Sequence, residues 1–219
     1  MIFEIDNIEL DFGKKRILSG IYLKAETGKI TGIVGANGTG KSSLMNIIFG
    51  NLKPTQKLIR IDSKAYLKPL FTSGLVKYLP QHSVIPTYLQ LEKAFKLYKV
   101  DWNEFVSFFP DFSKCGKSRP DELSGGQQRV FETYLTVKSP SQLLLLDEPF
   151  THLSPLNIER FKTFLLEEKK KKAIVITDHM YRHILDTADE LYLLKNCCSK
   201  YINHPRELED YRYLNPNTL

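Results

Sequence analysis

The pattern of hydrophobic and polar residues changes character after the first 25 positions. Residues 2–10 and 16–25 alternate between apolar and polar side chains with a period near two, which predicts two antiparallel strands. Later apolar runs are short and continuous, which is typical of a parallel sheet covered on both faces. The further predicted strands are 29–35, 58–62, 75–80, 143–147, 173–177 and 190–194.

Segments with helical spacing alternate with these strands. The predicted helices are 41–50, 125–138, 155–169 and 179–188. Between residues 87 and 122 aromatic and aliphatic residues recur at helical spacing, which predicts a small helical lobe inserted between strands. The aromatic stretch Tyr88–Phe112 suits either a partner-binding surface or plain core. The tail 196–219 is polar and predicts one helix.

Composition favours one soluble domain. The chain has 219 residues, 42% hydrophobic and 26% charged, and no apolar run approaches the ~20 residues that span a bilayer. Glu4, Asp6 and Glu9 argue against a secretory signal, so we expect a cytoplasmic chain unless a partner holds it at a membrane. The net charge of +6 is scattered apart from Lys169–Lys172, which predicts a solvated surface and no nucleic-acid partner.

The segment GANGTGKSS matches the phosphate-binding pattern G-x-x-x-x-G-K-[ST], with a predicted strand before it and a helix after it. Glycines let successive backbone N–H groups face one anion, and the helix directs its positive end to the same point. Lys41 is suited to the β- and γ-phosphates, Ser42 to Mg²⁺ and Ser43 to the α-phosphate. The predicted ATP-binding residues here are Gly35, Ala36, Asn37, Gly38, Thr39, Gly40, Lys41, Ser42 and Ser43.

Two carboxylates follow the leucine run 143–146. Asp147 ends the strand, where ligands bind in open α/β sheets, and is predicted to hold the metal. Glu148 comes next and is predicted to act as the general base on a water in line with the γ-phosphate. The predicted fold is therefore α/β: a P-loop NTPase (RecA-like) core with a mainly parallel sheet, an N-terminal antiparallel β lobe and a small inserted α-helical lobe.

Nearly the whole chain resembles an ATP-binding cassette (ABC) ATPase. The hallmarks are LDFGK with Phe12, the P-loop, YLPQHS with Gln81, LSGGQ at 123–127, the pair Asp147-Glu148, and VITDH with His179. The resemblance implies that Phe12 stacks on adenine, that Gln81 contacts the metal and the attacking water, and that His179 is a catalytic switch residue. It also implies one ABC ATPase domain over 1–219, in which 1–86 and 123–219 form the core and β lobe and 87–122 the helical lobe.

The LSGGQ motif at 123–127 is called the signature below. The resemblance implies that it contacts a nucleotide that is bound to a partner cassette. Two cassettes sandwich two ATP molecules, and Ser124, Gly125, Gly126 and Gln127 of each are expected to contact the ATP of the other. A second anion cradle at a helix N-terminus suits a γ-phosphate that arrives from outside. The expected partner is a second ABC ATPase subunit, either an identical copy or a close relative, and the expected cofactors are ATP and Mg²⁺.

Two departures from the family pattern stand out. Ser154 occupies the position of an aspartate that supports contacts across the interface, which predicts weaker coupling between the two sites. Phe12 replaces the commoner tyrosine and keeps the stacking face.

The leading functional hypothesis is the ATP-binding subunit of an ABC transporter, peripheral to the cytoplasmic face of the membrane and bound to separate integral membrane subunits. The alternatives are a soluble ABC-type ATPase that acts on DNA or ribosomes and a non-catalytic clamp. The soluble class usually carries a coiled coil, a zinc insertion or a second cassette, and this chain has none of these. Glu148 and His179 argue against the clamp.

Overall fold

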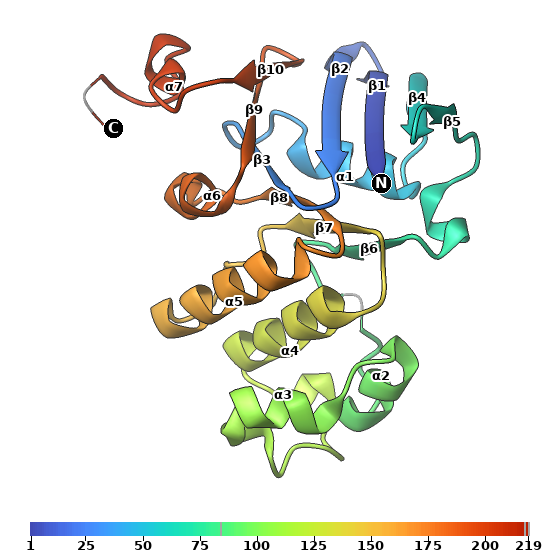
Figure 1. The fold of residues 1–219 in the computed structure, drawn as a ribbon, viewed down its shortest axis with the longest axis vertical. Helices are drawn as coiled ribbons and strands as arrows, with labels where there is room; N and C mark the ends of the chain where they lie inside the picture. Colours follow the sequence, from blue (N-terminus) through green and yellow to red (C-terminus); the bar gives the residue numbers. More distant parts are fainter. Residues whose placement is uncertain (84, 217, 219) are drawn as a thin grey trace.

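The computed structural model describes residues 1–83, 85–216 and 218, and arranges them around two β-sheets (Figure 1). Among these residues the larger sheet has the strand order β10-β9-β3-β8-β7-β6. Its strands are β3 (Ile30–Val34), β6 (Val76–Leu79), β7 (Leu143–Asp147), β8 (Ala173–Thr177), β9 (Glu190–Lys195) and β10 (Cys198–Ile202). The pairings from β9 across to β6 are parallel, and β10 adds an antiparallel edge. The carboxyl ends of β3 and β7 therefore meet at one edge.

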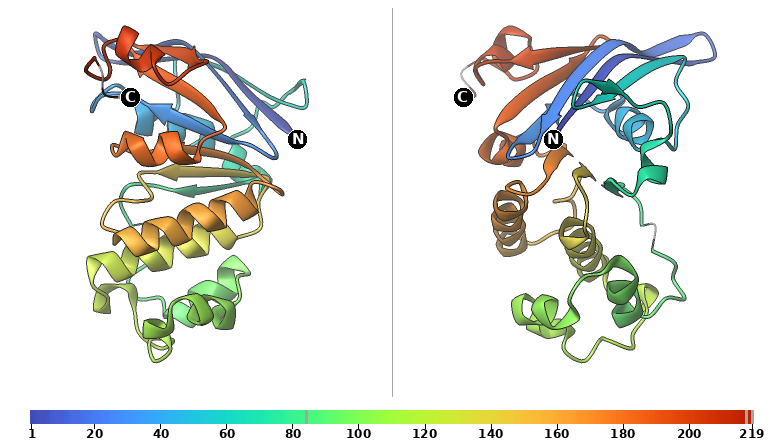
Figure 2. Two further views of the ribbon diagram at one scale, coloured as in Figure 1. Left: turned by 60° about the vertical axis from the view of Figure 1, so that its left-hand side comes forward. Right: turned by 45° about the vertical axis from the view of Figure 1, so that its right-hand side comes forward.

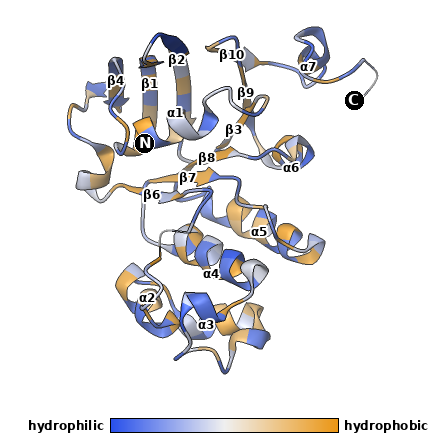
Figure 3. Cartoon of the chain, turned by 180° about the vertical axis from the view of Figure 1, so that it is seen from behind, coloured by the Kyte–Doolittle hydropathy of each residue, from blue (hydrophilic) through white to orange (hydrophobic). Residues whose placement is uncertain are grey.

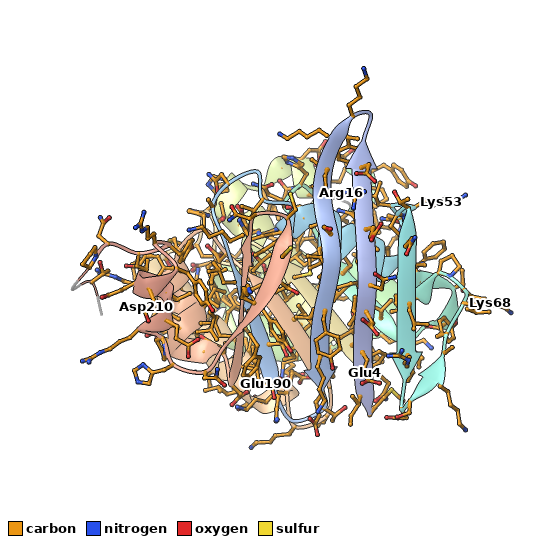
Figure 4. All side chains as sticks on the ribbon, turned by 90° about the horizontal axis from the view of Figure 1, so that it is seen from above. Glu4, Arg16, Lys53, Lys68, Glu190 and Asp210 are labelled. Atoms are coloured by element: carbon orange, nitrogen blue, oxygen red, sulfur yellow. The ribbon has the colours of Figure 1, made fainter. Side chains whose placement is uncertain are left out.

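The smaller sheet is antiparallel and forms the N-terminal lobe. Its order is β2-β1-β4-β5, with β1 (Ile2–Phe12), β2 (Lys15–Glu26), β4 (Gln56–Ile61) and β5 (Lys64–Ala65). Alternation along β1 buries Ile5 and then Ile8, because the register shifts between them at Asn7, which has φ 48°. Seen from above, the labelled charged side chains lie spread around this face of the molecule (Figure 4).

Helices cover the larger sheet and build the lobe beyond it. Figure 1 shows α4 and α5 under the sheet, with α2 and α3 further out, and both views of Figure 2 agree. The helices are α1 (Lys41–Phe49), α2 (Leu91–Tyr98), α3 (Trp102–Phe108), α4 (Gly125–Lys138), α5 (Pro155–Glu168), α6 (Tyr181–Thr187) and α7 (Glu207–Asp210). Short 3₁₀ turns are η1 (Leu70–Ser73), η2 (Pro110–Phe112) and η3 (Pro120–Glu122). Within 87–122 the described elements are α2, α3, η2 and η3.

The larger sheet separates two hydrophobic cores. In β7, Leu144 and Leu146 face the core that includes α4 and α5. Leu143 and Leu145 face the other core, which includes α1 and the smaller sheet. All four side chains are fully buried, and β7 and β8 are among the hydrophobic strands of Figure 3. A strand buried on both faces must be apolar at every position, which explains the continuous leucine run.

The aromatic stretch Tyr88–Phe112 mainly builds the core of the lobe. Phe95 and Phe105 are completely buried, with ring centroids 4.9 Å apart, and both rings pack near Tyr134 of α4. Tyr88, in contrast, is 76% exposed. Of the two interpretations of this stretch, core packing accounts for most of its rings.

The predicted fold class is confirmed, and the sequence missed two strands. The helix predicted over 125–138 has those bounds in the structure, whereas β5 and β10 were not predicted. A two-residue turn, Asn196-Cys197, joins β9 to β10 with φ 50° and 63°. Such turns normally carry glycine at the second position, so cysteine concealed the hairpin. Among the described residues no helix combines the length and apolarity needed to cross a membrane.

Candidate functional site

The phosphate-binding loop follows β3 and leads directly into α1. Gly38 and Gly40 adopt φ 79° and 99°, a left-handed conformation that favours glycine. At Gly35 a side chain would not fit, since its Cβ would lie 2.6 Å from the carbonyl oxygen of Leu194. The close approach to β9 thus requires the first glycine, and the turn requires the other two.

Lys41, the first residue of α1, lies across this loop. Its Nζ donates hydrogen bonds to the carbonyl oxygens of Gly35 (2.7 Å) and Ala36 (3.1 Å). The side chain is buried, and burial lowers the pKa of the ammonium group while the carboxylates of Glu148 and Asp147 oppose this shift. A cation held at the base of a glycine loop is placed to meet a phosphate.

One cavity of about 650 Å³ gathers most of the predicted residues. It is lined by Phe12, Asn37, Gly38, Gly40, Lys41, Ser42, Ser43, Gln81, Glu148 and His179, together with Ile17 and Thr151, which were not predicted. Gly35, Ala36 and Thr39 form the loop without lining the cavity. Phe12 is 53% exposed, so its ring face is free for an aromatic ligand.

Two of these residues, Gln81 and His179, converge on the carboxylate of Glu148. The Nε2 of Gln81 donates to Oε2 of Glu148 at 3.0 Å. The Nδ1 of His179 lies 3.5 Å from the same oxygen, too long for a strong hydrogen bond, and 3.4 Å from Oδ1 of Asp178. Glu148 itself adopts φ 52°, which is uncommon for a residue with a side chain. The loop after β7 thus turns this carboxylate toward the cavity.

Asp147, at the end of β7, presents an unsatisfied oxygen. Its Oδ2 accepts a hydrogen bond from the Tyr78 hydroxyl at 3.3 Å, and Oδ1 has no hydrogen-bond partner within the described part of the chain. The side chain is 1% exposed, and burial raises the pKa of its carboxyl group. Because a buried carboxylate oxygen is costly without a partner, this site fits a divalent cation. The cavity-lining residues Ser42 and Gln81 offer further oxygen ligands.

The signature residues lie elsewhere. Ser124 caps α4: its Oγ accepts from the backbone N–H of Gln127 at 3.3 Å, and Oε1 of Gln127 accepts from the N–H of Ser124 at 3.0 Å. Gly126 and Gln127 line a separate cavity of about 520 Å³, together with His152 and Ser154. The P-loop cavity contains no signature residue. The two predicted anion cradles of one chain therefore do not face each other.

Arg129 joins these regions and was missed by the sequence reasoning. The side chain is 6% exposed, and its Nη2 donates to the carbonyl oxygens of Asp147 (2.9 Å) and Glu148 (2.6 Å). Its Nη1 donates to the carbonyl oxygen of Pro80 at 2.9 Å. One side chain of α4 thus holds the backbone on either side of the cavity. The sequence gives no signal for this role, because Gln128, Glu132 and Thr133 around it on the helix are polar as well.

Asp178 is a second missed residue. Its Oδ2 accepts from the backbone N–H of Phe150 at 3.2 Å, and its Oδ1 accepts from that of Met180 at 2.9 Å. The carboxylate is completely buried, and burial raises its pKa. It therefore ties the loop after Glu148 to the segment that carries His179.

Ser154 stands at the start of α5. It is the N-cap of α5, and its Oγ accepts from the backbone N–H of Asn157 at 3.4 Å. Serine and aspartate are both good N-cap residues, so the start of α5 does not depend on the difference.

Fold and loop together define a P-loop NTPase architecture. A family model described as ABC transporter matches residues 18–151. The chain belongs to this family, the ABC transporters, and the resemblance stated from the motifs is confirmed.

Relatives and solved structures agree. The chain is 31% identical to a probable ABC transporter ATP-binding protein of Cyanophora paradoxa, over 92% of this chain and 87% of that protein. It is 26% identical to a probable sulfate/thiosulfate import ATP-binding protein of Chlorella vulgaris, over 94% and 93% of the two chains. The solved structure of an ATP-binding subunit of an ABC transporter superposes with a TM-score of 0.80 at 20% identity, covering 99% of this chain and 95% of that one. That last likeness concerns the fold.

Proposed function

We propose that this chain is the ATP-hydrolysing subunit of an ABC transporter whose membrane-spanning subunits are separate chains. The observation that carries the proposal is the division of the site. Residues of the P-loop, Gln81, Glu148 and His179 line one cavity, whereas Gly126 and Gln127 of the signature line another. A site divided in this way is completed by a second cassette. Family membership and the names of the relatives support the transporter context.

Within one chain, each residue in and around the cavity has a separate role. Phe12 would stack on adenine, and the N–H groups of 35–43 and the Lys41 ammonium would bind the phosphates. The oxygens of Ser42 and Gln81, together with the buried carboxylate of Asp147, would hold Mg²⁺. When bound, Mg²⁺ neutralises charge on the phosphate oxygens. Glu148 accepts the proton of the attacking water, and His179 positions that carboxylate and the γ-phosphate.

The signature of a second copy completes the pocket. The Ser124–Gln127 capping box fixes the first turn of α4, so the N–H groups of Gly125 and Gly126 are available to a phosphate from outside. Two identical chains then associate isologously around two ATP molecules. Cleavage removes the phosphate contacts between the halves, so ATP binding closes the dimer and hydrolysis opens it.

A groove beside β6 is the proposed docking site for the membrane subunit. Its volume is about 570 Å³, and it is lined by the rings of Phe49, Phe71, Tyr78 and Tyr98, among others. Phe71 is 47% exposed, and its ring centroid lies 5.7 Å from that of Phe49. An aromatic groove of this kind suits the apolar face of a short helix.

Purification of the tagged chain from detergent-solubilised membranes tests the proposal. We expect a multi-span membrane protein to copurify, and Phe71→Glu to release it while ATP binding persists. Leu166→Glu is a matched control, because Leu166 is similarly exposed (45%) on α5, and the partner should remain. Copurification with nucleic acid or ribosomes, without a membrane protein, would support the soluble alternative and overturn the proposal.

A further inference from the structure

Tyr78 of β6 connects the aromatic groove to Asp147. Its side chain lines the aromatic groove, where its ring centroid is 5.4 Å from that of Phe49. Its hydroxyl reaches in the other direction and bonds to Oδ2 of Asp147, the carboxylate at the end of the neighbouring strand β7. The wall of the groove and the candidate metal site thus share one side chain.

The hydrogen bonds around the phenol have a defined direction. The Nδ2 of Asn46 donates to the backbone oxygen of Ser42 at 2.8 Å and to the Tyr78 oxygen at 3.2 Å. An amide N–H₂ can only donate, so the phenol oxygen accepts from Asn46. An ionised carboxylate can only accept, so the phenol proton points to Asp147. Asn46 therefore orients Tyr78, which in turn holds Oδ2.

This arrangement leaves the other carboxylate oxygen free. Within the described residues Oδ1 of Asp147 has no hydrogen-bond partner, although the side chain is almost completely buried. The bond from Tyr78 restricts rotation of the carboxylate, and the Ser42 hydroxyl is a second neighbour that favours its charged form. Groups that orient a metal ligand in this way commonly tune the affinity for the metal.

We propose that Tyr78 is a positioning residue, which orients Asp147 for Mg²⁺ and makes Mg²⁺ affinity sensitive to packing in the aromatic groove. The inference rests on the proposed function, in which Asp147 binds the metal and the groove binds the membrane subunit. The bond of 3.3 Å is about 0.5 Å longer than the usual O–H···O bond, so a small displacement of the ring toward Asp147 strengthens it. A membrane subunit bound in the groove would pack against the Tyr78 ring and can push it toward Asp147.

The first test measures binding and requires no turnover. A fluorescent ATP analogue is titrated into wild-type protein and Tyr78→Phe, first in EDTA and then across a Mg²⁺ series. Loss of a long hydrogen bond to a charged group should raise the Mg²⁺ concentration at half-effect about five- to tenfold, with affinity in EDTA unchanged. Tyr192→Phe is the matched control, because its hydroxyl lies in the core and accepts from the backbone N–H of Lys24. It should leave the Mg²⁺ midpoint where it is.

Asp147→Asn separates failure of this inference from failure of the proposed function. If Mg²⁺ strengthens binding in the wild type and not in Asp147→Asn, the metal assignment stands, and an unchanged midpoint in Tyr78→Phe overturns the inference alone. If Asp147→Asn responds to Mg²⁺ like the wild type, the metal assignment itself is wrong. Should Tyr78→Phe fail to fold, Asn46→Ala replaces it, and its midpoint should rise in the same direction.

The link to the groove is tested by a double-mutant cycle. Phe49→Leu removes the ring that packs on Tyr78. It should shift the Mg²⁺ midpoint when Tyr78 is present and leave it unchanged in the Tyr78→Phe background, because the connection runs through the phenol. Equal shifts in both backgrounds, or no shift in either, would overturn the link.

Discussion

Replacing Arg129 by methionine tests whether one arginine holds the site together. The side chain is 6% exposed and donates to three carbonyl oxygens, those of Pro80, Asp147 and Glu148. Methionine keeps much of the length and apolar volume and removes every donor. The carbonyl oxygens then lose their charged partner inside the protein.

The expected loss of folding stability is the difference between two opposing contributions. Each hydrogen bond to a charged group contributes about 1.5–3 kcal/mol, so three lost bonds remove about 4.5–9 kcal/mol. Part of this is offset, because the variant no longer buries a guanidinium, a cost that is evident in the lowered pKa of Arg129. A net loss of about 3 kcal/mol corresponds to a fall in Tm of about 6–12 °C for a chain of this size.

Scanning calorimetry measures the expected loss of stability, and ATPase rates measure the expected loss of activity. We expect the lower Tm together with a loss of kcat that persists well below the melting temperature, because Glu148 has lost the bond to its carbonyl oxygen. Arg182→Met, at an exposed arginine of α6, should change Tm by less than about 1 °C. An Arg129→Met protein with wild-type Tm and kcat would refute the reasoning.

Three further outcomes concern nucleotide binding. Glu148→Gln should bind ATP without cleaving it and should elute as a dimer in size-exclusion chromatography; a monomer at saturating ATP would count against Glu148 as the base. Lys41→Ala should abolish ATP binding in calorimetric titration, and undiminished affinity would contradict the P-loop assignment. Phe12→Ala should weaken ATP binding about tenfold, since stacking on an aromatic ring contributes about 1–3 kcal/mol, while Phe12→Tyr should keep wild-type affinity.

Local features of the site could be predicted from the sequence because they depend on neighbours in the chain. The turn of the P-loop needs glycine at Gly38 and Gly40, and both adopt left-handed φ. The capping box of Ser124 and Gln127 involves only four consecutive residues, so it depends on local sequence alone. The leucine run before Asp147 required burial on both faces, and the two cores meet that requirement.

Contacts between distant segments could not be predicted in this way. No pattern in the sequence predicts that Arg129 donates to the carbonyl oxygen of Pro80, or that Asp178 accepts from the backbone N–H of Phe150. The aromatic stretch of the lobe suited two roles, and only its packing against α4 assigned most rings to the core.

The sequence by itself thus determined the order of the helices and of the strands other than β5 and β10, the phosphate loop and the family. These follow from periodicity and from backbone demands that act over a few residues. Tertiary structure alone decided that the signature and the P-loop of one chain lie apart, and that Tyr78 stands between a groove and a buried carboxylate. The physical reason is that strand order in the sheet, and not position along the chain, sets which side chains meet.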